Sequence, residues 1–147
     1  MPLLHDPVVS ASMRSRLGNL TPASERQWGK MSVDQMLWHV NKMLSNGLGH
    51  FRPADLRIPL PKAVIRFIVL RLPWPRGSPT LPEAKPREHY SFDAERDRCL
   101  ALIDEFTQRT LDAPGWGHSG GLGDIGGRQW SELQAKHLDH HLRQFGV

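Results

Sequence analysis

The sequence predicts an all-α fold, a bundle of four principal helices with short extra helices and long loops rich in proline or glycine. Four segments repeat their apolar residues with helical spacing. No segment shows the alternation of apolar and polar residues that is typical of a half-buried strand. The length of 147 residues, 39% of them hydrophobic, suits one globular domain over residues 1–147. A disordered chain and a fibre are excluded by this composition.

The first two helices are expected from their start signals. A helix is predicted over residues 7–17, because Asp6 is a favoured N-cap residue and a proline follows it. A second helix is predicted over residues 32–47, where Ser32 and Gln35 have the spacing of a capping box. Glycines follow both segments and end them.

The remaining elements are separated by two unusual loops. A third helix is predicted over residues 61–73, and five prolines in residues 73–86 indicate a stiff, extended connection. A fourth helix is predicted over residues 93–111. Seven glycines then mark a loop over residues 115–127, which lacks the Gly-Lys-Ser/Thr ending of a phosphate-binding loop. The last helix is expected over residues 128–145.

Charge, cysteine content and hydropathy exclude several classes of protein. The net charge of +4 comes from basic residues scattered over different helices, so a nucleic-acid partner is not expected. The most apolar stretch, residues 63–72, spans about half a bilayer core, so we expect no membrane partner. Neither a signal peptide nor a disulfide is expected, because the start is charged and Cys99 is the single cysteine. These features favour a cytoplasmic location.

Three of the eight histidines lie close together in the last helix. On a helical wheel with Trp130 at zero, His137 lies near 340° and His141 near 20°, within the apolar stripe. Gln134 lies between them at about 40°, and His140 lies outside at about 280°. Histidines at i and i+4 can reach one metal ion. The alternative is a pair of core histidines that only hydrogen-bond to backbone carbonyls.

A third candidate ligand lies on the second helix. On a helical wheel of this second helix, His39 lies at the border of the apolar arc, near Met36 and Met43. Three histidines from two helices would match a zinc-type site with an open position, whereas the alternative is a half-buried surface histidine. The sequence has no His-Glu-x-x-His motif, and the carboxylates of Glu132 and Asp139 are predicted on the solvent-facing side.

Other residues could line a pocket near these histidines. Gln134 and Gln144 are candidates from the last helix, and His118 is a candidate from the glycine-rich loop. For His118 the alternative is a solvated loop residue. The loop tryptophans, which we expect to cover the ends of the bundle, are Trp28, Trp74 and Trp116.

Three strings of residues resemble the DinB/YfiT-like superfamily, and within it a bacterial family of domains of unknown function. They are Trp28-Gly-Lys-Met-Ser32, Gln35-Met-Leu-Trp-His39 and His137-Leu-Asp-His-His-Leu-Arg-Gln-Phe-Gly-Val147. The resemblance extends from about Arg16 to the C-terminus, and the last string is the most specific. It implies a DinB-type four-helix bundle, often dimeric, with a divalent metal on His39, His137 and His141.

The resemblance also implies an activity. Characterised relatives include transferases and isomerases that use low-molecular-weight thiols such as mycothiol or bacillithiol, and the resemblance does not imply DNA binding. We therefore expect a divalent-metal-dependent enzyme, a thiol-dependent transferase or a hydrolase acting on a small electrophile, in a homodimer. The expected ion is Zn²⁺ or Ni²⁺, with iron as an alternative, and no catalytic residue is assigned. The alternative function is a stress-related protein that binds a metal or a small ligand without turnover.

Overall fold

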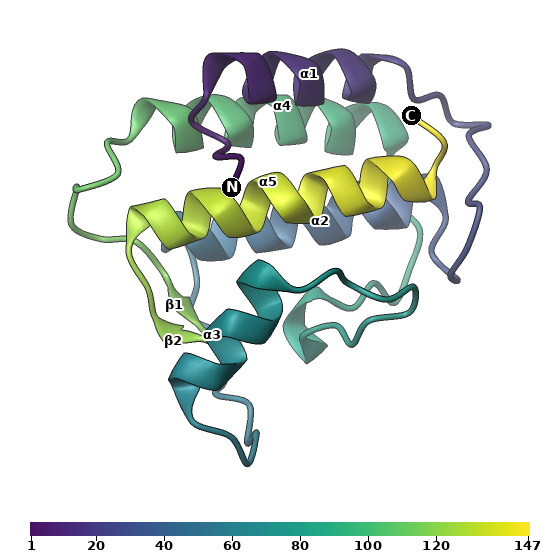
Figure 1. Cartoon of the computed structure of the whole chain (residues 1–147). Coiled ribbons are helices and arrows are strands. Elements are labelled where there is room, and N and C mark those ends of the chain that lie inside the picture. The colour runs from purple at the N-terminus through teal and green to yellow at the C-terminus, as the bar shows by residue number, and fades with distance from the viewer.

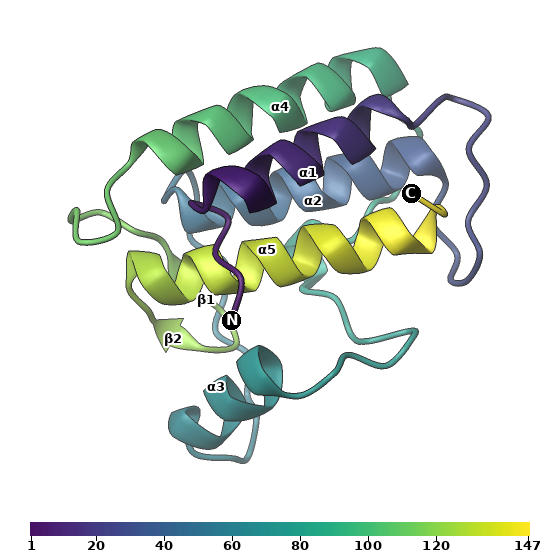
Figure 2. The ribbon, with the colours of Figure 1, turned by 45° about the horizontal axis from the view of Figure 1, so that its top comes forward.

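The computed structural model describes residues 1–147, and it confirms the predicted all-α fold. Four long helices lie side by side in a bundle, as Figures 1 and 2 show. They are α1 (Pro7–Gly18), α2 (Val33–Gly47), α4 (Phe92–Gln108) and α5 (Gly127–Gln144). A shorter helix, α3 (Lys62–Arg71), is set apart from the bundle.

The expected start signals operate at two of the helices. Asp6 accepts a hydrogen bond from the Val8 amide at 2.8 Å at the start of α1. The Ser32 amide donates to Gln35 Oε1 at 3.1 Å, which is one half of a capping box at α2. Local hydrogen bonds of this kind satisfy amides that the helix itself leaves unpaired, which explains why sequence alone placed these starts well.

Helix α4 ends at Gln108, three residues before the predicted end at residue 111. The chain turns to an extended conformation at Arg109. Its guanidinium donates to the carbonyls of Leu48 at 3.0 Å and Gly115 at 3.1 Å. These contacts tie the end of α4 to the end of α2 and to the glycine-rich loop, so the helix does not continue.

The glycine-rich loop contains a small hairpin that the sequence pattern did not indicate. Strand β1 (His118–Ser119) pairs antiparallel with β2 (Gly123–Asp124), and His118 faces Asp124 in the register. Two-residue strands are too short to produce a visible alternation in sequence. Gly123 has a φ of 78°, a conformation that favours glycine.

Helix α5 is in contact with three other helices, α1, α2 and α3. Trp130 on α5 is fully buried, and its indole Nε1 donates to the Gly117 carbonyl at 2.8 Å. Gly47 at the end of α2 leaves the space that the Trp130 and Phe106 rings fill. Contacts on several sides of α5 bury most of its side chains, including His137 and His141.

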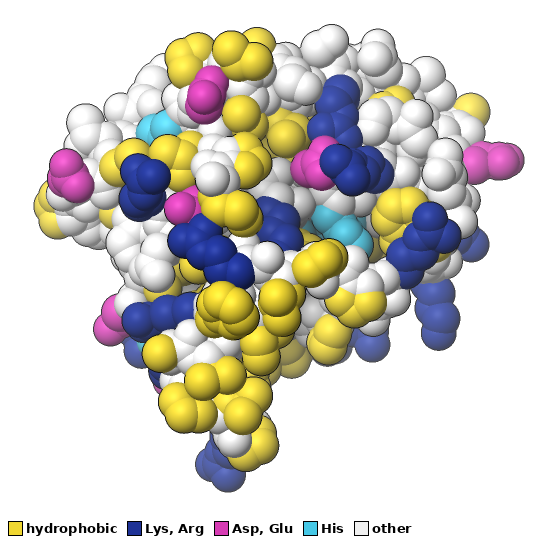
Figure 3. Space-filling model, viewed as in Figure 1, with side chains coloured by type: hydrophobic (Ala, Val, Ile, Leu, Met, Phe, Trp, Pro, Cys, Tyr) yellow, Lys and Arg dark blue, Asp and Glu magenta, His cyan; other side chains and the backbone are white.

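Residues 51–86, which contain α3, leave the bundle and return to it. Lys62 donates to the Gly121 carbonyl at 3.1 Å, and Arg66 donates to the Leu122 carbonyl at 3.0 Å, so α3 is held on the hairpin. The outer face of α3 carries exposed apolar side chains, among them Phe67 and Ile68 (Figure 3). The proline-rich part of this segment includes one 3-10 turn, η1 (Pro82–Ala84).

None of the five α-helices combines the length and the apolar character that crossing a membrane requires.

Candidate metal centre

Three histidine rings from two helices meet between α2 and α5. His39 comes from α2, and His137 and His141 come from consecutive turns of α5. The Nε2 atoms of His39 and His137 are 2.8 Å apart, and one nitrogen from each of the three rings lies within 4.8 Å of the others. The residues are 4%, 7% and 8% exposed, respectively. The structure therefore brings together the three residues that the helical wheels and the family resemblance selected.

Hydrogen bonds fix the orientation of two of these rings. His39 Nδ1 lies 2.8 Å from the carbonyl oxygen of Ala84. A carbonyl can only accept, so Nδ1 of His39 carries the proton. Nε2 of the same ring is then left with a free lone pair that points at the other two histidines.

Gln144 orients the third ring. Its amide nitrogen donates to the Trp28 carbonyl at 2.9 Å, and this contact turns its Oε1 toward His141. His141 Nδ1 donates to that oxygen at 2.8 Å. The lone pair of His141 is therefore also on Nε2, as it is in His39. A metal-bound histidine ordinarily donates its other N–H in this way, which raises the basicity of the ligand nitrogen.

His137 is held differently from the other two. Its Nε2 donates to Nε2 of His39, and its buried Nδ1 has no hydrogen-bond partner. The indole of Trp74 packs against the ring, with the centroids 5.9 Å apart. A buried nitrogen without a partner is costly, so this ring is the least satisfied member of the cluster.

Burial keeps all three rings neutral. Desolvation lowers the pKa of His39, and with the neighbouring histidines it lowers that of His137 further. The pKa of His141 falls to about 3, again mainly because of burial. Neutral imidazole is the form that binds metal ions.

The donor set fits one divalent cation. Two nitrogens bound tetrahedrally to Zn²⁺ at its usual bond length lie about 3.4 Å apart. The 2.8 Å contact between Nε2 of His39 and Nε2 of His137 is shorter than this, so that hydrogen bond would give way when both nitrogens bind a cation. A cation would replace a hydrogen bond between two imidazoles by bonds to three lone pairs.

The predicted neighbours of the cluster differ in their placement. Gln144 lies against His141, whereas Gln134, fully buried, donates to the Met43 carbonyl at 3.0 Å and so joins α5 to α2. His140 lies beside the cluster as the helical wheel predicts, and its ring contacts those of Trp28 and Trp74. These two tryptophans therefore pack beside the last turns of α5.

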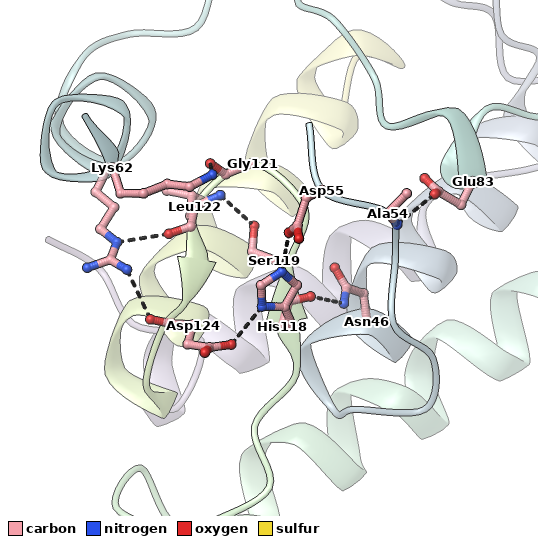
Figure 4. Close-up of polar contacts among 11 residues, drawn as sticks. Asn46, Ala54, Asp55, Lys62, Glu83, His118, Ser119, Gly121, Leu122 and Asp124 are labelled. Carbon is pink, nitrogen blue, oxygen red and sulfur yellow. Dashed lines mark hydrogen bonds and ion pairs between the residues drawn. The ribbon is translucent and has the colours of Figure 1, made fainter. Parts of the chain in front are cut away.

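His118 is not part of the cluster, which corrects its expected position near the site. It lies on the hairpin, where its Nδ1 donates to Asp124 at 2.6 Å and its Nε2 donates to Asp55 at 2.5 Å (Figure 4). These two hydrogen bonds raise the pKa of His118, with the bond to Asp124 contributing most, and they lower the pKa of each carboxyl. His118 thus connects the hairpin to the segment that leads into α3.

Glu132 is also placed differently from the sequence expectation. It was predicted on the solvent-facing side of the last helix, but it is only 6% exposed. Arg71 and Arg128 pair with its carboxylate at 3.4 Å and 3.8 Å. Asp139 is paired as well, with Arg16 at 2.8 Å. Both carboxylates are therefore held in ion pairs away from the histidines.

Sequence reasoning missed two contributors from residues 73–86. One is the Ala84 carbonyl, which orients His39, and the other is Trp74, which packs against His137. A main-chain carbonyl has no signature in sequence. The tryptophan could have been found only by knowing that the proline-rich segment returns to α5.

Comparison with known proteins gives one match. The family model described as the DinB superfamily matches residues 10–145. No curated protein and no solved structure matches the chain. The family match covers almost the whole chain and includes all three clustered histidines, so the resemblance indicated by the sequence motifs is confirmed.

Removing the Gln144 side chain should weaken metal binding without removing a ligand. The variant Gln144→Ala leaves His141 Nδ1 without its acceptor, and we expect a 10–100-fold loss of affinity for Zn²⁺ in a competition titration with a chromogenic chelator. The matched control, Gln108→Ala on the exposed end of α4, should bind as the wild type does. Equal affinities of the two variants would contradict a role for Gln144 in orienting His141.

The His118 cluster should make stability depend on pH. The pKa of His118 is raised in the folded state, so its stabilisation is complete below about pH 6.5 and is lost as the pH rises through the folded pKa. The free energy of unfolding of wild type should therefore exceed that of His118→Asn by more at about pH 5.5 than at about pH 9. Urea titrations at both values test this, and a difference that does not change with pH would refute it.

Proposed function

Because the chain belongs to the DinB superfamily, we propose that His39, His137 and His141 hold one divalent cation and that the protein is a metal-dependent enzyme. Its reaction is the transfer of a low-molecular-weight thiol to a small electrophile, or the hydrolysis of such an electrophile. The ion is Zn²⁺ or Ni²⁺, with iron as the alternative, since three neutral imidazoles suit each of these metals.

One observation carries this proposal, the direction of the lone pairs. The Ala84 carbonyl accepts a hydrogen bond from Nδ1 of His39, and the Gln144 side chain accepts one from Nδ1 of His141. Both Nε2 lone pairs consequently point into the same space, next to Nε2 of His137. Histidines that are buried for packing alone need only an acceptor for the ring N–H. They have no reason to turn their remaining lone pairs toward one another.

The surroundings of the cluster determine what the chain itself contributes to the reaction. When bound, a divalent cation lowers the pKa of a coordinated thiol or water and so supplies a nucleophile. Trp74 covers His137 and limits the access of water to that ring. Glu132 and Asp139 are engaged by arginines, so neither carboxylate is free to act as a general base at the cluster.

The proposal also covers the source of the thiol and the location of the protein in the cell. The single cysteine, Cys99, is fully buried, and burial raises the pKa of its thiol to about 12. The protein therefore offers no reactive thiol of its own, and a thiol nucleophile has to be a separate small molecule. Such thiols are abundant in the cytoplasm, which is the location that we propose.

Metal content is the first test. We expect wild-type protein, purified without a histidine tag or chelator, to hold about one metal ion per chain by elemental analysis. His39→Ala, His137→Ala and His141→Ala should each lose most of it, whereas His140→Ala should keep it because that ring lies outside the cluster. Equal metal content in all five proteins would remove the proposed site.

Turnover is the second test. Zn²⁺- or Ni²⁺-loaded protein should consume a small electrophile in the presence of bacillithiol or mycothiol, or hydrolyse it without a thiol. Activity should disappear on chelation and return when the metal is restored. A fully loaded protein that turns over none of these combinations would instead be a metal-binding protein without catalytic function.

A further inference from the structure

A cleft opens beside the histidine cluster, on the side of α5 that faces Trp28 and Trp74. Its volume is about 600 Å³, within the range of about 300–1,000 Å³ that is typical of small-molecule sites. Three separate parts of the chain form its walls, namely residues 27–28, residues 73–76 and the last turns of α5. Figure 3 shows basic side chains and a histidine side chain gathered over this part of α5.

The cleft shares a wall with the candidate metal centre. Trp74 lines the cleft and packs against His137, with the centroids 5.9 Å apart. His140 also lines the cleft, and its ring lies 5.1 Å from that of His141. A molecule in the cleft would therefore be separated from the rings of His137 and His141 by the side chains of Trp74 and His140 alone. This position beside the candidate metal centre suits a substrate.

The walls carry more positive than negative charge. Arg76, Lys136 and Arg143 line the cleft, and Asp139 is the single acidic side chain among the lining residues. Asp139 is already neutralised by Arg16 at 2.8 Å and Arg143 at 3.0 Å. Arg76 and Lys136 make no ion pair within the chain, so their charges are available to an anion.

The two uncompensated cations lie over aromatic rings. The Arg76 guanidinium is 4.5 Å from the centroid of the Trp28 ring, and the Lys136 ammonium is 4.9 Å from that of Trp74. Lys136 is fixed there, because it also donates to the carbonyls of Val69 and Leu72 at the end of α3. Arg76 is exposed and has only its ring contact, so it is free to turn toward a ligand.

We propose that this cleft binds a small organic anion with a flat apolar part, which lies between Trp28 and Trp74 while its acidic group meets Arg76 and Lys136. The chemistry of the acidic group is that of a carboxylate or a phosphate monoester, since both accept hydrogen bonds from guanidinium and ammonium groups. As a substrate site the cleft rests on the proposed metal-dependent function, but anion binding itself does not.

Isothermal titration with matched probes tests this proposal. We use 2-naphthoate, its neutral isostere 2-naphthamide and 2-naphthyl phosphate, each with the chelated and the Zn²⁺-loaded full-length protein. We expect one saturable site per chain for both anions, and at least about fivefold weaker binding of the amide, the factor that about 1 kcal/mol of charge interaction gives. The difference between the anions shows which acidic group the cleft prefers.

Two arginine variants locate the binding site. Arg76→Gln should weaken naphthoate binding about fivefold, by the same conversion, because one of the two free charges is removed. The control Arg87→Gln changes an exposed arginine outside the cleft and should bind as the wild type does. Equal binding of acid and amide, absence of saturable binding, or equal effects of the two substitutions would each overturn the proposal.

The metal-free arm separates this proposal from the preceding one. Naphthoate should bind the chelated protein, because Arg76 and Lys136 are not metal ligands. If the wild type holds no metal but binds naphthoate, the anion site stands without the metal centre. If the metal is held but naphthoate does not bind, or binds only the Zn²⁺-loaded protein, the cleft proposal alone fails.

Discussion

The structure depends on one constraint, the burial of three neutral imidazoles with their lone pairs turned toward one another. Inside a protein, a polar nitrogen without a partner is costly, and two of the three Nδ1 atoms are accordingly paired. The direction in which each Nε2 atom points is set by these hydrogen bonds and by the packing of α5 between its neighbours. The cluster is in this way a product of the whole bundle, since no single helix could orient it.

The segment formed by residues 51–86 is the second determinant of the site. Lys62 and Arg66 attach α3 to the hairpin, and His118 attaches the chain that precedes α3. From there the proline-rich stretch returns to the bundle and delivers a carbonyl and an indole to the histidines. Prolines reduce the conformational entropy that this long connection loses when it becomes ordered. This suits a segment that holds the histidine rings in position.

The sequence could predict what is encoded locally. Helix starts follow from caps at Asp6 and Ser32, and the phase of α5 directs His137 and His141 inward while His140 stays beside them. Contacts between residues that are far apart in the sequence could not be predicted in this way. A single-helix wheel assumes one buried face, so it misplaced Glu132 on a helix that is covered from several sides. His118 sits in a glycine-rich loop, where no periodicity indicates direction.

The hydrogen bond from His39 to Ala84 has a consequence for how the family diverges. Its acceptor belongs to the peptide backbone, so replacing the side chain at position 84 leaves the acceptor atom in the chain. What the position does restrict is bulk, because Ala84 is fully enclosed. Among relatives, selection on this contact would therefore be visible as a preference for small residues near the end of the proline-rich stretch, with no polar residue to mark it.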